Sequence, residues 1–227
     1  MSIEALSTKY VGQTAQVYDR VRAGKKWDTE HVAIAQLLNH VASGSKVLDV
    51  PVGTGRLLPY FKARKFETYG VDVSADMLSQ ANATAEQLGG QVQLQRSDIR
   101  SVPFHNGSFD LVVCLRFLNM VDSDELKVVL GELTRLSRDK LLIGIRYVTP
   151  FSDVRPLPTE VGRLALRPIL AARWLGRRIY GRRSDIILHD KASLLKLFDD
   201  LNLKIADVRY VERRWDNTDY VLWLLEK

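Results

Sequence analysis

Apolar positions recur along this chain with two periods, and the two periods alternate from residue 47 onward. Short aliphatic and β-branched runs predict strands at 47–49, 68–72, 91–95, 109–115 and 140–146. Apolar residues at helical spacing predict helices at 57–61, 74–88 and 122–136. Strands that alternate with helices predict a parallel sheet covered by helices on both faces.

The two ends of the chain depart from this alternation. Before the first strand, the pattern predicts helices at 14–22 and 29–41, with Asp28 as the N-cap of the second. After the fifth strand, 193–201 predicts a helix, and 204–211 and 219–225 predict two strands close together in sequence.

The turn after the first predicted strand carries the strongest chemical signal. It reads Asp49-Val50-Pro51-Val52-Gly53-Thr54-Gly55-Arg56. Glycines in a turn that leads into a helix let backbone N–H groups approach a ligand closely. About twenty residues on, the second strand ends in Asp72, and an acid at this place can accept hydrogen bonds from ribose hydroxyls. The two signals predict a nucleoside-containing cofactor across the ends of two neighbouring parallel strands.

Two departures from the dinucleotide fingerprint narrow the cofactor class. That fingerprint has three glycines that place a pyrophosphate on a helix N-terminus. Here Pro51 replaces the first glycine, and the carboxylate of Asp49 at the mouth of the turn would repel a pyrophosphate. An acid at this position suits a cofactor that carries cationic groups.

The chain resembles the class I S-adenosylmethionine-dependent methyltransferases over roughly residues 44–146. The turn at 49–56 is similar to the family's first motif, and Asp72 matches its ribose-binding acid. Ser97-Asp98-Ile99 matches the adenine-side loop, and 108–114 matches the fourth strand. Pro51 stands where the family pattern has glycine, which stiffens the turn and removes one N–H donor.

The resemblance implies an α/β fold and a set of cofactor contacts. The fold is a Rossmann-like seven-stranded sheet in the order 3-2-1-4-5-7-6, mostly parallel with an antiparallel C-terminal hairpin and with helices on both faces. The implied cofactor is S-adenosylmethionine. Its expected contacts are Asp49, Pro51, Gly53, Thr54, Gly55, Arg56, Asp72, Val73, Met77, Ser97, Asp98, Ile99, Leu115, Arg116, Tyr10 and Tyr18.

Composition bounds the class and the compartment of the protein. A chain of 227 residues with 46% hydrophobic content is consistent with one domain, 1–227, with a helical cover at 1–43. No apolar run approaches the ~18 residues of a membrane span. We found no signal peptide pattern and a single cysteine, Cys114, in a predicted buried strand, so we expect a cytoplasmic protein. No His, Cys or acid spacing indicates a metal site.

Residues 149–191 form an insertion with an excess of arginine. The arginines at one helical period are Arg163, Arg167, Arg173, Arg177 and Arg178. They are consistent with a solvated face, an anion-binding lid, or a helix that contacts an anionic membrane surface or an acidic partner. The last of these would place the protein at the periphery of a membrane.

In this family the reactive methyl group belongs to the cofactor, so no fixed catalytic residue is implied. Residues that face the acceptor are expected from the chain start, from the loop after the fourth strand and from the insertion. The candidates are His189, Arg116, Asn119 and Tyr18. Asn119 can orient an acceptor but cannot take a proton, and the alternative for His189 is a surface or helix-capping histidine beside Asp190.

Three functions are compatible with these residues. The leading one is direct in-line methyl transfer to a small, anionic or lipid-like acceptor, because no separate recognition domain accompanies the predicted domain. The second is an RNA methyltransferase that contacts phosphates through the arginine-rich insertion. The third is an S-adenosylmethionine-binding protein with a regulatory or non-transfer role, because a fold does not fix a function.

Overall fold

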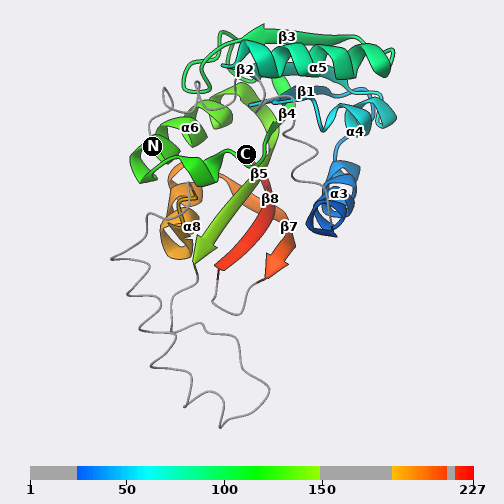
Figure 1. Cartoon of the computed structure of the whole chain (residues 1–227). Helices are drawn as coiled ribbons and strands as arrows, with labels where there is room; N and C mark the ends of the chain where they lie inside the picture. Colours follow the sequence, from blue (N-terminus) through cyan, green and yellow to red (C-terminus); the bar gives the residue numbers. More distant parts are fainter. Residues whose placement is uncertain (1–24, 149–185, 214–217) are drawn as a thin grey trace.

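The structure, a computed structural model, describes residues 25–148, 186–213 and 218–227, and its strands form one sheet (Figure 1). Within these ranges the sheet has eight strands, in the order β3-β2-β1-β4-β5-β8-β7, with β6 paired to β5. The strands are β1 (Lys46–Asp49), β2 (Glu67–Asp72), β3 (Val92–Arg96), β4 (Phe109–Cys114), β5 (Ser137–Val148), β6 (His189–Asp190), β7 (Lys204–Arg213) and β8 (Thr218–Glu226).

The strand directions confirm the predicted fold class. Parallel pairs join β1 to β2 and β4, β2 to β3, and β5 to β4 and β6. Strand β8 is antiparallel to both β5 and β7. Without the two-residue strand β6, the order is the expected 3-2-1-4-5-7-6, and β6 is the one addition to the predicted sheet in the described residues.

Helices cover both faces of the sheet. They are α3 (Lys25–Leu37), α4 (Leu58–Ala63), α5 (Ala75–Gln87), α6 (Ser123–Leu136) and α8 (Lys191–Asp200), with the 3-10 helices η1 (Leu38–His40) and η2 (Leu118–Met120). One buried cluster joins α3 and α4 to the sheet through Ile34 and Phe61. A second cluster joins α6 and α8 to the other face through Leu130 and Phe198, so Figure 1 shows α3 and α6 on opposite sides.

Side-chain caps fix where three of the helices begin. Ser74 accepts a hydrogen bond from the backbone N–H of Met77, and Asp122 accepts from the first turn of α6. The predicted helices at 74–88 and 122–136 are confirmed to within one residue. Asp190 caps α8 by accepting from the N–H of Ser193, so this helix begins at Lys191 and not at the predicted Ser193.

Two further local predictions were wrong. Asp28 does not cap a helix that starts at Thr29, because the residues from Lys25 onward are already helical. Strand β5 is longer than the predicted 140–146, because it follows α6 directly at Ser137 and continues to Val148 against β8. The predicted helix at 14–22 and most of the insertion, 149–185, lie outside the described residues.

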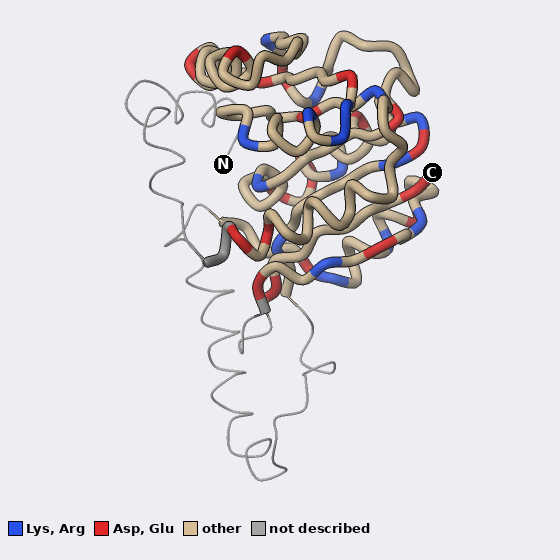
Figure 2. Tube along the Cα trace, turned by 90° about the vertical axis from the view of Figure 1, so that its right-hand side faces the viewer, with Lys and Arg blue, Asp and Glu red and all other residues tan. Residues whose placement is uncertain are grey.

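Charges of both signs are mixed along the described trace (Figure 2). The arginine-rich stretch from Arg163 to Arg178 belongs to the part of the chain that the structure does not describe. Among the described helices, none is long and apolar enough to cross a membrane.

Candidate active site

The C-terminal ends of β1 and β2 bring Asp49, Asp72 and the glycine turn together. Register pairs Asp49 with Gly70, two residues before Asp72. The turn is held by backbone hydrogen bonds from Val50 N–H to the Val113 carbonyl at 2.9 Å and from Val52 N–H to the Val71 carbonyl at 2.8 Å. Doubly wound sheets bind their ligands at the carboxyl ends of the strands, so this arrangement has the position of a ligand site in such a fold.

The side-chain carboxylate of Asp49 is buried and has no hydrogen-bond partner in the described part of the chain. Its residue is 2% exposed. Burial raises the pKa of Asp49 to about 8, Arg56 opposes this rise, and the nearby Asp72 adds to it. A buried carboxylate without a donor is costly when ionised. The site therefore favours a cationic group beside Asp49.

Asp72 is also buried, but backbone N–H donors hold it. Its Oδ2 accepts from the N–H of Gly53 and its Oδ1 from the N–H of Ser74, both at 2.9 Å. Burial raises the pKa of Asp72, although these backbone hydrogen bonds work in the opposite direction. Each carboxylate oxygen can accept a second hydrogen bond, which leaves capacity for two hydroxyl donors such as those of a ribose.

The two glycines of the turn have different roles. Both have positive φ, +56° at Gly53 and +79° at Gly55. A Cβ at Gly53 would meet no heavy atom within 4 Å, so the backbone is open to a ligand there. A Cβ at Gly55 would lie 2.8 Å from Leu58 Cδ1 and 3.1 Å from Ala81 Cα. Gly55 is thus required by the packing of the turn on α4 and α5.

The predicted adenine-side residues follow β3, beside the end of β2. Ser97 N–H binds the Asp72 carbonyl at 3.2 Å, which joins the ends of β2 and β3. The carboxylate of Asp98 pairs with Arg100, with Oδ2 at 2.6 Å from Nη2. Burial acts to raise the pKa of Asp98, but the Arg100 hydrogen bonds hold it below its ordinary value. Ile99 and Met77 are buried apolar residues.

A buried acid that the sequence analysis missed connects the turn to the loop after β4. Glu30, on α3, is fully buried and accepts from Arg56 Nη1 at 3.1 Å, from Arg116 Nε at 2.9 Å and from the Tyr220 hydroxyl at 2.9 Å. The signal was present, because Glu30 lies four residues before Ile34 on the apolar face of its helix.

Charge balance sets the state of Glu30. Burial acts to raise the pKa of Glu30, but the attraction of Arg56 and the hydrogen bonds from Arg116 and Tyr220 outweigh it and hold the pKa below its ordinary value. Glu30 is therefore ionised, and two of the predicted cofactor residues, Arg56 and Arg116, are bound to it.

Asn119 and His189 have defined structural partners. The Asn119 side-chain oxygen accepts from the Arg146 N–H, and its carbonyl accepts from the Ile187 N–H at 2.6 Å. His189 is 4% exposed, and its Nε2 lies 2.8 Å from the Leu118 carbonyl. The alternative of a surface histidine is therefore wrong. Burial lowers the pKa of His189, although Leu118 and Asp122 partly oppose this.

The remaining predicted residues have plainer surroundings. Leu115 and Thr54 are buried, and the Thr54 carbonyl accepts from the Thr84 hydroxyl at 2.9 Å. Pro51 follows a cis peptide bond, and the Val73 carbonyl accepts from Arg96 at 2.9 Å. Tyr10 and Tyr18 lie outside the described residues. Within the described ranges, no group of acids, histidines and cysteines could hold a metal ion.

A groove of about 480 Å³ lies away from these residues, at the starts of β2 and β3. Glu67, Glu86 and Gln91 are among the residues that line it. Since the predicted cofactor residues lie at the other ends of these strands, we do not assign the groove to the site.

Comparison with known proteins agrees with this geometry. Residues 47–140 match the family model of a methyltransferase domain. The chain is 32% identical over 140 residues to a phosphatidylethanolamine N-methyltransferase of Cereibacter sphaeroides. The aligned residues cover 61% of this chain and 65% of that protein. It is also 35% identical over 94 residues to a demethylmenaquinone methyltransferase of Thermus thermophilus, and these residues cover 40% of this chain and 41% of that protein.

The matches thus span less than two thirds of each of these relatives. Among solved structures, magnesium protoporphyrin IX methyltransferase from Synechocystis PCC 6803, with bound SAH, superposes with a TM-score of 0.71 at 17% identity. That superposition covers 100% of both chains and shows a common fold. Residues 47–140 thus correspond to a methyltransferase domain, and the fold is one that the chain shares with the magnesium protoporphyrin IX methyltransferase.

Proposed function

We propose that this chain transfers a methyl group from S-adenosylmethionine to a small acceptor that is anionic or lipid-like. The observation that carries the proposal is the carboxylate of Asp49, which is buried at the mouth of a glycine turn and receives no hydrogen bond from the described residues. A cationic cofactor supplies the missing partner of this acid, whereas a dinucleotide pyrophosphate would be repelled.

The residues at the strand ends fit the donor. Asp72 has acceptor capacity for ribose hydroxyls, Gly53 leaves its backbone open, and Ile99 and Met77 offer apolar surface to an adenine. When bound, S-adenosylmethionine supplies an electrophilic methyl group on a sulfonium. The chain's own work is to orient the donor, to exclude water and to hold the acceptor in line.

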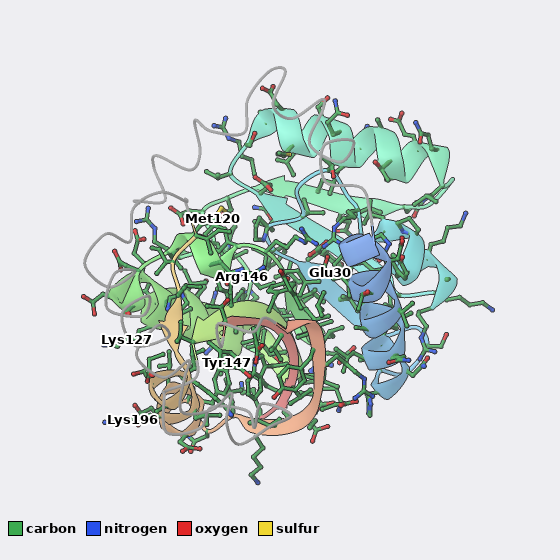
Figure 3. The ribbon with its side chains drawn as sticks, turned by 60° about the horizontal axis from the view of Figure 1, so that its bottom comes forward. Glu30, Met120, Lys127, Arg146, Tyr147 and Lys196 are labelled. Carbon is green, nitrogen blue, oxygen red and sulfur yellow. The ribbon has the colours of Figure 1, made fainter. Side chains whose placement is uncertain are left out.

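Charges on the acceptor side support an anionic acceptor. Arg146, near the C-terminal end of β5, reaches across the Tyr220 ring, with its Cζ 5.5 Å from the ring centroid, to Glu212 at 2.9 Å. The guanidinium of Arg116 lies 5.9 Å from the same ring. Together with Arg56, three guanidinium groups face the carboxylates of Glu30 and Glu212 and would attract an anionic acceptor. Figure 3 labels Glu30 on α3 and Arg146 on β5.

We assign no general base to the two sequence candidates with known surroundings. The side-chain oxygen of Asn119 is used by the Arg146 N–H, and the ring of His189 is buried against a backbone carbonyl. Transfer to an acceptor that is already nucleophilic needs no proton acceptor from the protein. The name of the Cereibacter protein indicates a lipid amine as its acceptor, and such an amine is nucleophilic once it has lost its proton to solvent.

Two measurements test the proposal. Calorimetry with S-adenosylhomocysteine should show one site on the wild-type chain. Labelled S-adenosylmethionine should then be offered with an aminophospholipid, a quinol with an isoprenoid tail, a porphyrin carboxylate and transfer RNA. We expect label in one of the small acceptors. Label in RNA alone would replace the proposal with the RNA alternative, and binding without transfer to any acceptor would favour a regulatory role.

A contact with an anionic surface is a separate part of the proposal, and it rests on sequence. The insertion carries Arg163, Arg167, Arg173, Arg177 and Arg178, all outside the described residues. Changing Arg173, Arg177 and Arg178 to Glu alters the local charge by about −6, which should abolish binding to anionic vesicles at physiological salt. Affinity for S-adenosylhomocysteine should stay within about threefold. Unchanged vesicle binding by the triple variant would remove the insertion from such a contact.

A further inference from the structure

Glu30 is the point at which three otherwise separate segments meet. Its carboxylate accepts from Arg56, which follows the glycine turn, from Arg116, which follows β4, and from Tyr220 on β8. These partners are 26, 86 and 190 residues away in sequence. The side chain of Glu30 has no exposed area, whereas those of Arg56 and Arg116 are 13% and 21% exposed. The acid is thus the shared centre of the cluster.

Both arginines lie in backbone segments that contain a residue with positive φ. Arg56 comes directly after Gly55, whose φ is +79°, and Arg116 has a φ of +60° itself. A residue other than glycine in this region is strained by roughly 1–2 kcal/mol and persists only where its surroundings fix it. In the described structure, the side-chain anchor common to both segments is Glu30.

We propose that Glu30 is a positioning residue that holds the cofactor turn and the loop after β4 in one arrangement, so that donor and acceptor sides are set together. This inference rests on the proposed function, because it assigns these two segments to donor and acceptor. Glu30 acts through Arg56 and Arg116 and is not expected to touch either substrate.

The cluster is well suited to this role. A buried ion pair holds its geometry when every charge has partners, and removal of one partner leaves buried charges uncompensated. Here one carboxylate serves two guanidinium groups and a hydroxyl, so its loss releases both loops at the same time. Tyr220 adds a third tie, from the sheet, because its ring is flanked by the guanidinium groups of Arg116 and Arg146.

The test compares Glu30→Gln with Glu132→Gln. Glu132 is a matched control, since it also binds an arginine, Arg135, and a backbone N–H, that of Val102, but on α6. Amide hydrogen exchange should rise in both 51–57 and 115–121 in Glu30→Gln and in neither segment in Glu132→Gln, which should loosen 102–107 instead. Calorimetry should show S-adenosylhomocysteine affinity at least about tenfold weaker in Glu30→Gln and within about twofold in Glu132→Gln.

Several results would overturn the inference. Faster exchange only around α3, or exchange that rises equally throughout the chain, would make Glu30 a purely structural acid. If Glu30→Gln does not fold, Arg116→Lys replaces it, because lysine keeps the charge but loses the two-point contact. That variant should loosen 51–57 through Glu30, and an effect limited to 115–121 would contradict the proposal. Failure of the wild type to bind S-adenosylhomocysteine would reject the proposed function, while the exchange results would still decide the role of Glu30.

Discussion

Glu30 and Asp49 are two buried carboxylates near the same turn, and they have opposite electrostatic surroundings. Glu30 receives hydrogen bonds from three side chains, which hold its pKa below the ordinary value. Asp49 receives none from the described residues, and burial raises its pKa to about 8. Burial alone therefore does not distinguish a structural acid from a binding acid. The supply of donors does: Glu30 receives three side-chain hydrogen bonds in the described structure, whereas the proposed cofactor would supply the cationic partner of Asp49.

The largest effect is expected from neutralising Asp49, the acid that receives no hydrogen bond from the described residues. Asp49→Asn should weaken S-adenosylmethionine binding by about 100-fold, because a charge-assisted interaction of about 3 kcal/mol is lost. Calorimetry measures the change. Asp110→Asn serves as the control, since Asp110 binds Lys46 N–H and Arg138 at the other end of the sheet. Equal affinity in wild type and Asp49→Asn would leave the acid without a ligand role.

The two glycines between these acids should separate stability from binding. Gly55→Ala should lower the free energy of unfolding by about 2 kcal/mol, because the new Cβ contacts Leu58 and Ala81 at positive φ. Gly53→Ala has open space and should cost about 1 kcal/mol from backbone strain alone. Urea melts give both values. A larger loss for Gly53→Ala would contradict the packing role of Gly55.

Asp72 tests an acid of intermediate type, with backbone donors on both oxygens. Asp72→Ala should weaken cofactor affinity at least tenfold, since ribose hydroxyls lose a charged acceptor and Gly53 loses its tie. Circular dichroism checks that the variant is folded. Unchanged affinity in a folded variant would exclude Asp72 from the site.

The smallest effect concerns protons. Binding of the cationic cofactor should displace the proton of Asp49, so affinity for S-adenosylmethionine should rise about threefold between about pH 7.5 and pH 8.5 and level off above the pKa of about 8. Folding has the opposite sign, because the folded chain keeps a proton that the unfolded chain has lost. Stability of the free protein therefore falls as pH rises from the unfolded pKa of Asp49 toward 8. Asp49→Asn should lack both slopes.

The sequence predicts those parts of the molecule whose signals are contiguous in the chain, and it misses those that depend on contacts between distant residues. The turn at 49–56, Asp72 and the alternation of strands with helices are contiguous patterns, and the fold class that they indicate was confirmed. The assigned roles of the cofactor residues remain predictions. The spacing of Glu30 from Ile34 indicates that Glu30 is buried, but its partners lie up to 190 residues away, so no local pattern indicates the cluster. Asp28 was misplaced because the helix continues upstream, where Lys25 and Lys26 carry no cap signal.

His189 is a second residue whose surroundings the local sequence could not predict. The acid that follows it, Asp190, made an exposed or helix-capping histidine a reasonable alternative from sequence. Asp190 is itself the cap of α8, and His189 is buried because β6 pairs with β5 at Tyr147. That pairing joins residues about forty positions apart, so no pattern around His189 could have indicated it.

The lack of a side chain at Gly144 restricts which residues related sequences can carry at the positions around it. A Cβ at this position of β5 would collide with the Tyr220 hydroxyl, so the bare backbone of Gly144 makes room for the bond between Tyr220 and Glu30. Its backbone is not in the left-handed region, so the requirement is one of space alone. Positions 30, 144 and 220 should therefore covary among related sequences. Where position 144 gains a side chain, the tyrosine and the acid should be replaced together.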